Sequence, residues 1–525
     1  MAAIPDKARF DYIIIGAGSA GCVLANRLSE SGRHRVLLLE AGGHDRHMWI
    51  HIPLGYGKLF DDAKVNWRYK TEPEPELNNR QIIQPRGKVL GGSSSINGLL
   101  YVRGQHEDYD HWRQLGNTGW GFADVLPYFR RAEDQARGAD DFHGAGGPLA
   151  VSDVCEPHPL CDAFIEAAQR AGVPRNDDFN GATQEGAGYF QLTAKNGRRW
   201  STAVGYLRQA RRRRNLAIVS NAMASRILFS GRRAVGIQFL QHSVPRIAYA
   251  DGEVIVSGGA FNSPQLLQLS GLGPAKILRD LGIDLIADMP GVGADLQDHL
   301  QIRMQYRCTE PITMNDVINH WRQRYGAGLR YLTSRKGLLT IGAGYAGAFL
   351  RTRPELATPD VQIHFLIFSA DAAGAVLHPL SWLHGLGVPV AAAESRLRAH
   401  HIERSKRAAG NPTAISFGAR RLRHRGRRNE GDAPHHERAG DAPLHRGRAR
   451  ARRSLRARRR SPRIRPRHRH DGLPSDLDLP HGPRSSGGGR RAVARARLGG
   501  PARDRRFDHA DSSVRQHQCG RGDDW

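Results

Sequence analysis

The sequence lacks the features that would place the chain across a membrane or outside the cell. No stretch approaches the roughly 20 consecutive apolar residues that a spanning helix needs, although 39% of the 525 residues are hydrophobic. The first ten residues, MAAIPDKARF, contain no apolar signal core, so we do not expect secretion. A cytoplasmic location is therefore predicted.

Cysteine is scarce and scattered. The chain has an odd number of cysteines, at Cys22, Cys155, Cys161, Cys308 and Cys519. Neither a disulfide framework nor the ligand spacing of a zinc site is present in this pattern. We predict reduced thiols and no metal site.

Basic residues far outnumber acidic ones in the last quarter of the chain. Residues 401–525 contain 33 Lys and Arg but 13 Asp and Glu, so 20 of the 27 net positive charges lie there. Lysine is absent after Lys406, while Arg, His, Gly and Pro become frequent from about residue 381. This composition predicts a disordered Arg-rich tail over 381–525. Such a tail binds phosphates nonspecifically, so no specific nucleic-acid partner is expected.

The N-terminal part contains the pattern of a dinucleotide site. An apolar strand over 12–15 leads into Gly16, Gly18 and Gly21, a helical pattern follows, and the strand 36–39 ends at Glu40. In this motif the first glycine permits the tight turn, the second lets backbone approach a pyrophosphate, and the third lets helix and strand pack closely.

The helix that this motif predicts begins at Ser19 and Ala20, whose N–H groups would face the phosphates. Glu40 is expected to accept hydrogen bonds from the adenosine ribose. The motif alone leaves FAD and NAD open, whereas an acid at position 40 disfavours NADP.

Two longer motifs follow in order, GKVLGGSSSINGLLYVRG at 87–104 and GAFNSPQLLQLSGLG at 259–273. They resemble the two signatures of the glucose–methanol–choline (GMC) oxidoreductases, and the chain is most like the choline dehydrogenase-type members. NGRRWSTAVGYL at 196–207 and GVGADLQDHL at 291–300 resemble further elements of that family. The resemblance covers residues 10–380.

The resemblance implies an α/β flavoprotein with a Rossmann-like FAD-binding domain and a smaller α+β substrate-binding domain. Residues 8–310 would form mainly the FAD domain, with a substrate-domain insertion at roughly 150–200, and residues 311–380 would begin the substrate domain. The segment 91–97 would wrap the flavin. The family's cofactor contacts match Val89, Gly92, Ser93, Asn97, Gly98, Leu99, Leu100 and, at the adenine end, Ala224. Ile96 stands where some relatives attach FAD through His, so noncovalent FAD is implied.

The family oxidises alcohols by passing a hydride to the flavin while a His removes the hydroxyl proton. That His belongs to a Tyr-His-Pro-type motif with an Asn-Thr-Asn-type partner motif, and the chain has neither. Near the C-terminus, where that motif would be expected, His470, His481, His509 and His517 lie in anomalous sequence. We therefore assign no catalytic residue.

A change of reading frame accounts for the loss. Read one nucleotide later, residues 501–524 permit a family-like C-terminus that includes Asn-Thr-Asn. In the same frame, residues 476–482 permit Thr-Ser-Thr-Tyr-His-Thr-Gly and residues 382–392 permit Gly-Phe-Thr-Ala-Ser-Val-Cys-Gln-Leu-Arg-Pro. We interpret most of the region beyond 381 as out of frame.

Two functions remain open at this point. The first is FAD-dependent oxidation of a primary alcohol, choline or a similar one, to the aldehyde, with a quinone, another acceptor or oxygen taking the electrons. The second is a catalytically inactive flavin-binding product. Peripheral association with the inner membrane is an alternative to a purely cytoplasmic location. Trp67 and Tyr69 are candidates for a cage around a quaternary ammonium, but packing is the more common role of such aromatics.

Overall fold

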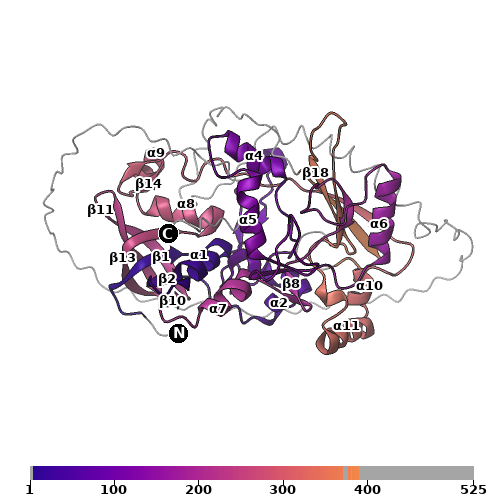
Figure 1. Ribbon diagram of the computed structural model, residues 1–525, viewed down its shortest axis with the longest axis horizontal. Helices are drawn as coiled ribbons and strands as arrows, with labels where there is room; N and C mark the ends of the chain where they lie inside the picture. Colours follow the sequence, from indigo (N-terminus) through magenta and orange to yellow (C-terminus); the bar gives the residue numbers. More distant parts are fainter. Residues whose placement is uncertain (1–3, 371–376, 380, 390–525) are drawn as a thin grey trace, which may run out of the picture. The chain divides into compact units, whose positions relative to one another are not determined.

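The computed structural model of the protein describes residues 4–370, 377–379 and 381–389. Two larger sheets organise these residues, and each has its own hydrophobic cluster (Figure 1). One sheet combines parallel strands with an antiparallel meander, and the other is antiparallel throughout. The expected α/β fold with a second, mixed domain is confirmed.

The first sheet has the strand order β10-β2-β1-β13-β12-β11. Its strands are β1 (Ala8–Ile15), β2 (Val36–Leu39), β10 (Leu216–Val219), β11 (Ala222–Ser230), β12 (Arg233–Gln241) and β13 (Val244–Val256). The first four in spatial order run parallel, whereas β13, β12 and β11 are joined as an antiparallel meander. Distant parts of the chain therefore meet in one sheet.

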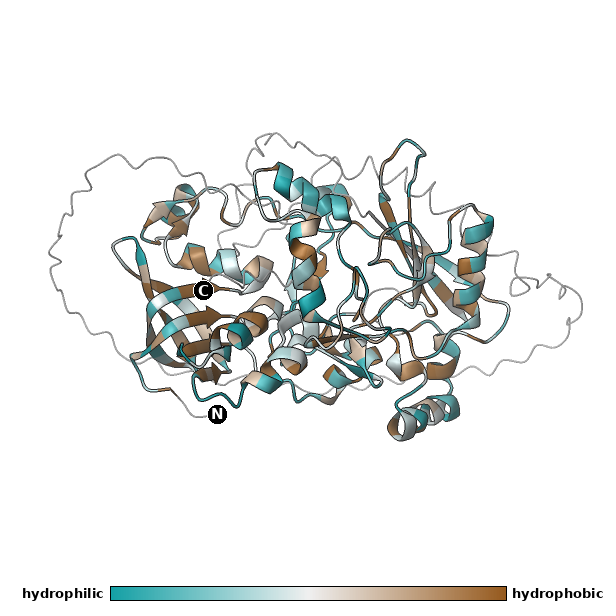
Figure 2. Ribbon diagram, viewed as in Figure 1, coloured by the Kyte–Doolittle hydropathy of each residue, from teal (hydrophilic) through white to brown (hydrophobic). Residues whose placement is uncertain are grey.

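The paired stretches of β1 and β2, residues 12–15 and 36–39, are apolar because both of their faces are covered. Ile13 and Leu37 are paired and belong to the hydrophobic cluster on one face. Their neighbours Ile14 and Leu38 are also paired and belong to the cluster on the other face, together with Cys22 of the following helix. Figure 2 shows these strands in the brown of hydrophobic residues. The strands predicted at 12–15 and 36–39 are confirmed.

Helices cover the first sheet. They are α1 (Ser19–Glu30), α7 (Arg208–Ala210) and α8 (Gly259–Leu269), and α9 (Ala275–Asp280) follows α8 in the chain. The helix α1 packs on β1 and β2, and α8 packs on β11. The turn between β1 and α1 therefore lies at the parallel half of the sheet.

The second sheet has the order β16-β19-β18-β17-β7. Its strands are β7 (Gly186–Tyr189), β16 (Ile302–Arg307), β17 (Ala346–Leu350), β18 (Val361–Leu366) and β19 (Trp382–Pro389). Three helices accompany them, α6 (Pro159–Arg170), α10 (Met314–Asn319) and α11 (Trp321–Ser334).

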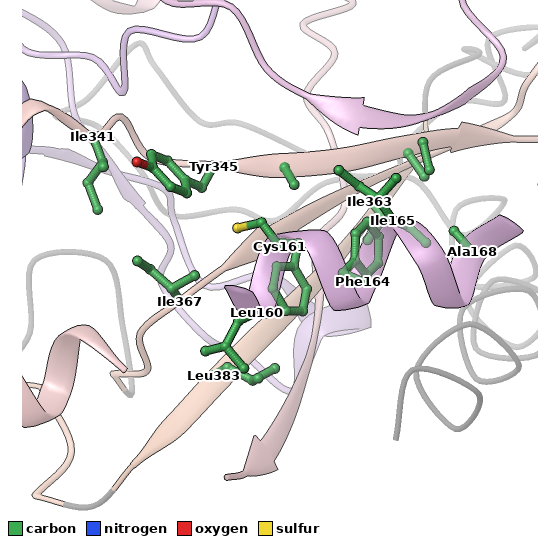
Figure 3. Close-up of a cluster of buried hydrophobic side chains, with 14 of the residues drawn as sticks. Leu160, Cys161, Phe164, Ile165, Ala168, Ile341, Tyr345, Ile363, Ile367 and Leu383 are labelled. Carbon is green, nitrogen blue, oxygen red and sulfur yellow. The ribbon is translucent and has the colours of Figure 1, made fainter. Parts of the chain in front are cut away.

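The core of this second part lies between α6 and its sheet (Figure 3). The rings of Phe164 on α6 and Phe365 on β18 stack with their centroids 4.6 Å apart. Leu160, Cys161 and Ile165 line the same face of α6. The helix is thus fixed to the sheet by a continuous apolar stripe.

Shorter elements connect the two sheets in sequence. The helices are α2 (Met48–His51), α3 (Tyr56–Leu59), α4 (His106–Gln114) and α5 (Phe122–Ala132). The strand pairs are β3 (Tyr69–Lys70) with β4 (Ile83–Gln84), β5 (Glu133–Gln135) with β6 (Leu149–Val151), β8 (Ala194–Lys195) with β9 (Arg198–Arg199), and β14 (Leu272–Gly273) with β15 (Ala287–Asp288). Five single turns complete the set, η1 (Pro53–Gly55), η2 (Pro75–Leu77), η3 (Gly92–Ser95), η4 (Ala203–Leu207) and η5 (Leu338–Thr340). Within the described part of the chain, no helix is both long and apolar enough to cross a membrane.

The predicted boundary at residue 381 was placed too early. The strand β19 pairs with β16 on one side and β18 on the other, so residues 382–389 belong to the second sheet. Pairing on both sides supplies backbone partners that the composition of the segment does not reveal. The rest of the Arg-rich tail, from residue 390, lies outside the described residues.

A buried charged network supports the chain just after the segment 87–100. Arg103 donates to Glu133 at 2.7 Å, and the other oxygen of Glu133 lies 3.1 Å from His143 Nδ1. His143 Nε2 lies 2.9 Å from Asp178 Oδ2. Burial lowers the pKa of His143, but the hydrogen bonds to Asp178 and Glu133 outweigh this effect and raise the pKa to about 9. His143 is therefore protonated at neutral pH.

This network predicts a loss of stability in mild alkali. The pKa of His143 is higher in the folded state than the ordinary value of 6.5, so its contribution is complete below that value and is lost as pH rises towards 9. We expect the His143→Gln variant to be less stable by on the order of 1–3 kcal/mol at pH 6. Its unfolding temperature should then fall less than that of the wild type between pH 6.5 and 9. Parallel pH profiles for the two proteins would contradict the assignment.

Candidate cofactor site

The turn between β1 and α1 is closed by direct backbone contact. Gly16 has a φ of +99° and donates its N–H to the carbonyl of Leu39 at 2.8 Å. A Cβ atom on Gly16 would lie 2.5 Å from the Ser257 carbonyl oxygen, and one on Gly21 would lie 1.9 Å from the Gly16 carbonyl oxygen. Any side chain at either position would force the turn, the helix and β13 apart.

The N-terminus of α1 is open. Gly18 occupies the N-cap position, and no side chain of the described residues caps the helix there. A Cβ atom on Gly18 would meet nothing within 4 Å among the described residues. Ser19 and Ala20 follow as the first helical residues, with no acid in the first turn. Free N–H groups and the positive end of the helix dipole make this a place for an anion such as a pyrophosphate.

The second glycine-rich segment reaches the same turn. Gly91 donates its N–H to the carbonyl of Ala17 at 2.8 Å. Gly92 has a φ of +53°, and a Cβ atom on it would lie 2.7 Å from the Cα of Gly18. The structure thus brings the two predicted motifs together, although they are separated by more than 70 residues in the sequence.

The rest of the segment continues towards the second sheet. Ser93 accepts a hydrogen bond from the Gly87 N–H, and the Asn97 side-chain oxygen accepts one from the Leu99 N–H. Leu99 is buried with a φ of +67°, a strained conformation for a branched side chain. A Cβ atom on Gly98 would lie 2.2 Å from the Cβ of Ala343, which precedes β17.

Three further predicted residues pack into the structure around these segments. Val89 is fully buried in a cluster with Ile50 and Ile96. Ala224 lies on β11 two residues beyond Ala222, whose N–H donates to the Glu40 carbonyl. Leu100 packs partly buried beside Phe190. Cofactor contacts at these positions stay predictions.

Glu40 lies buried at the end of β2. Its two carboxylate oxygens accept the N–H groups of Ala17 at 2.9 Å and Gly42 at 2.8 Å. Burial raises the pKa of Glu40 to about 7, against the lowering effect of these two hydrogen bonds and of Lys88. Each oxygen has a second lone pair, so the group can hold the turn and still accept a ribose hydroxyl.

Sequence reasoning missed Arg199, which lies in the segment 196–207. Its side chain is 1% exposed and donates to backbone carbonyls of Ile50, Ser94 and Asn97 and to the side-chain oxygen of Asn97. Burial lowers its pKa to about 9. No local signal marks an arginine for burial, because its acceptors are about 100 or more residues away in the sequence.

His364 was also missed. It lies on β18, stacks on Phe190 with ring centroids 5.3 Å apart, and shares a neighbour with Leu100. A Cβ atom on that neighbour, Gly344, would lie 3.2 Å from both His364 Nδ1 and Leu100 Cδ1. Burial, with His299 as a second cause, lowers the pKa of His364 to about 4. A neutral imidazole therefore lies next to the end of the predicted flavin segment. A single His in VQIHFL resembles a core residue, so no local pattern marks it.

Trp67 and Tyr69 pack against each other rather than around an open space. Their rings stack with centroids 5.7 Å apart, and Lys88 Nζ lies 4.8 Å from the centre of the Trp67 ring. The Tyr69 hydroxyl accepts a hydrogen bond from Asn262. The face of Trp67 already has a cation, which favours the packing interpretation. His470, His481, His509 and His517 lie outside the described residues.

A βαβ turn with an open helix N-terminus, a buried acid at the next strand end and a second glycine-rich segment define an α/β protein that holds a nucleotide cofactor. The chain belongs to the GMC oxidoreductase family, because the family model matches residues 10–301, more than half of the chain. The predicted family membership is confirmed.

Relatives of known name agree with this assignment. The chain is 46% identical over 367 residues to mitochondrial choline dehydrogenase of Mus musculus and 45% identical over 359 residues to oxygen-dependent choline dehydrogenase of Vibrio vulnificus. These alignments cover 69% and 68% of this chain but 61% and 64% of the two relatives. The chain therefore matches less than two thirds of the length of either relative.

Solved structures share the fold. Pyridoxine 4-oxidase from Mesorbium loti is 27% identical with a TM-score of 0.66, and the match covers 83% of this chain and 81% of that one. A formate oxidase is 24% identical with a TM-score of 0.66, over 74% and 73% of the two chains. The second likeness shows the fold alone.

The glycine geometry predicts opposite effects for two similar substitutions. Gly16→Ala should destabilise the chain by about 2 kcal/mol or more, because it combines a positive φ with a clash against backbone. Gly18→Ala should leave the unfolding temperature nearly unchanged, since its Cβ atom meets no described atom. It should nevertheless weaken the binding of ADP, the half that FAD and NAD share, because the added methyl group occupies the anion site. Equal stability losses in the two variants would contradict this geometry.

Proposed function

We propose that the chain binds FAD noncovalently and belongs to an enzyme that oxidises a primary alcohol, choline or a similar one, to the aldehyde. The main support for the proposal is the close approach of Gly92 to Gly18, which brings the predicted flavin segment next to the predicted pyrophosphate site. The names of the similar proteins support both the substrate class and oxygen as one electron acceptor. A quinone or another acceptor is the alternative to oxygen.

The residues fit the cofactor. Gly18 leaves open space at the helix N-terminus, and Glu40 has a free lone pair on each oxygen for the ribose. Ile96 is buried in an apolar cluster and has no nucleophile for a covalent bond to the flavin. Bound FAD would supply the hydride acceptor. The protein would supply orientation and a hydrogen bond from the neutral His364 to the substrate hydroxyl.

Purified full-length chain tests this proposal. We expect visible flavin absorbance that is released by denaturation, because the attachment is noncovalent, and that bleaches when choline is added without oxygen. Flavin that is retained but never reduced would favour the second function, an inactive flavin-binding product. A protein with no flavin and no affinity for FAD would contradict the proposal.

The reading-frame hypothesis has its own test. Sequencing of the DNA across codons 375–525 should show the insertion or deletion that we propose. A frame-corrected chain should then gain the Tyr-His and Asn-Thr-Asn motifs, and choline should reduce its flavin at least 10²-fold faster, the scale of general-base catalysis. Equal rates in the two chains would contradict the hypothesis.

We also propose that the protein associates peripherally with an anionic membrane through α11. Trp321, Tyr325, Leu329 and Leu332 are 62–69% exposed and recur at the spacing of one helix face. Arg322 and Arg324 lie over the rings of Trp321 and Tyr325. No Asp or Glu occurs from residue 317 to 354. An interfacial helix has aromatic and aliphatic residues on one face and basic residues beside it.

Charge complementarity favours an anionic lipid surface over two other candidates for this face, the Arg-rich tail and a second copy of the chain. The Arg-rich tail is itself strongly positive, so it would be repelled by α11. A second copy would bring the same arginines together. A lipid surface with negative headgroups matches both the apolar stripe and its charges.

Replacing two stripe residues tests the membrane proposal. The double variant Trp321→Ser, Leu329→Ser should bind vesicles of phosphatidylglycerol more weakly than the wild type, by about tenfold for the two lost anchors. The double variant Met48→Ser, Ile83→Ser changes apolar residues that are 61% and 49% exposed elsewhere and is the matched control. Because the tail is present in all three proteins, its own affinity for anionic lipid cancels. Equal sedimentation of all three would contradict the proposal, as would a stripe variant that instead breaks up a dimer.

A further inference from the structure

Arg199 is a buried cation whose hydrogen-bond acceptors are all neutral. Its Nε donates to the Ile50 carbonyl at 2.8 Å, and one terminal nitrogen donates to the Asn97 carbonyl at 2.7 Å. The other terminal nitrogen is shared between the Ser94 carbonyl at 3.1 Å and the Asn97 side-chain oxygen at 2.7 Å. Among the described residues, no carboxylate pairs with it. The positive charge is therefore hydrogen-bonded but not balanced.

Arg103, the other deeply buried arginine close to this segment, shows the contrast. It is 3% exposed, and it donates to the carboxylate of Glu133 at 2.7 Å. Pairing with a carboxylate cancels most of the field of such a charge, and an unpaired charge in a dry site keeps it. Neutral donors bury no charge, so the arginine at position 199 leaves a positive charge in the dry interior beside the segment.

The bonds of Arg199 also hold the segment in place. They tie the end of α2, at Ile50, to the last residues of η3 and to Asn97. Asn97 lies in the part of the chain that would contact the flavin. The guanidinium thus serves several acceptors at once, which its planar fork allows and a lysine does not.

We propose that Arg199 positions the segment 94–97 and that its unbalanced positive charge stabilises the cofactor more when it is reduced than when it is oxidised. The inference rests on the proposed binding of FAD. Reduction adds a hydride, and with it negative charge, to the flavin. A nearby fixed cation in a medium of low dielectric constant favours that state. Arg199 is in this sense a positioning residue that also tunes the reduction potential.

A purely structural role predicts a different pattern. Loss of the hydrogen bonds alone would weaken the binding of oxidised and reduced FAD equally, so the ratio of the two dissociation constants would not change. Loss of the charge would weaken the binding of reduced FAD more. By linkage, that ratio fixes the shift in the reduction potential of the bound flavin.

The test compares three variants of the full chain with the wild type. Arg199→Gln removes the charge but keeps an N–H donor, Arg199→Lys keeps the charge but loses the fork, and Arg198→Met removes the exposed neighbouring charge. For each protein, the dissociation constant of FAD is measured by titration of the apoprotein, and the two-electron potential of the bound flavin is measured against redox dyes.

We expect the preference for reduced over oxidised FAD to be at least tenfold lower in the Gln variant than in the wild type, which corresponds to a potential about 30 mV lower for a two-electron couple. The Lys variant should bind FAD more weakly, but its preference for reduced FAD should stay within twofold of the wild-type preference. The Met control should match the wild type in both measurements. An unchanged potential in the Gln variant would overturn the proposal. If the Gln variant loses FAD during purification, its potential is measured at an FAD concentration above its dissociation constant, and the same two outcomes decide. Failure of the wild type to bind FAD would instead contradict the proposed function.

Discussion

The site depends on backbone segments that approach one another more closely than any side chain permits. A Cβ atom on Gly21 would lie 1.9 Å from the Gly16 carbonyl oxygen, one on Gly42 would lie 1.8 Å from the Lys88 carbonyl oxygen, and one on Gly92 would lie 2.7 Å from the Cα of Gly18. These contacts join the β1–α1 turn, the chain after β2 and the second glycine-rich segment into one unit. The position of that segment is therefore set by main-chain contact, which is far stiffer than contact through side chains.

Backbone packed this closely needs hydrogen-bond partners that are not water. Two charged side chains supply them. Glu40 accepts the N–H groups of Ala17 and Gly42, and Arg199 donates to the carbonyls of Ile50, Ser94 and Asn97. Burial shifts both groups towards their neutral forms, with the pKa of Glu40 raised to about 7 and that of Arg199 lowered to about 9. A short polar side chain could not reach as many backbone groups, which explains why charged residues occupy such costly positions.

The fold and the site could be predicted from the sequence where local interactions determine them. Residues 12–15 of β1 and the whole of β2 are runs of apolar residues, and Gly16 and Gly21 are dictated by sterics within one turn. Arg199 and His364 could not be found in this way, because their roles arise from partners that only the fold brings near. The acceptors of Arg199 lie 102–149 residues away in the sequence. A carboxylate-free burial site for an arginine is a property of the assembled fold and leaves no periodic trace.

The strand β19 shows where composition misleads and also why the region is unusual. It lies between β16 and β18, so among the described residues β16 is joined to the rest of the second sheet only through β19. Yet the strand contains Gly385 and Gly387, which weaken a strand interior because they have no side chain to pack. Its sequence is thus poorly suited to a position that the sheet requires. The shifted reading permits Phe, Thr and Val in this stretch, but also Gly, Ala and Ser, so strand propensity alone does not decide between the two frames. The strand is specified less by its own residues than by β16 and β18, whose backbone groups pair with it on both sides.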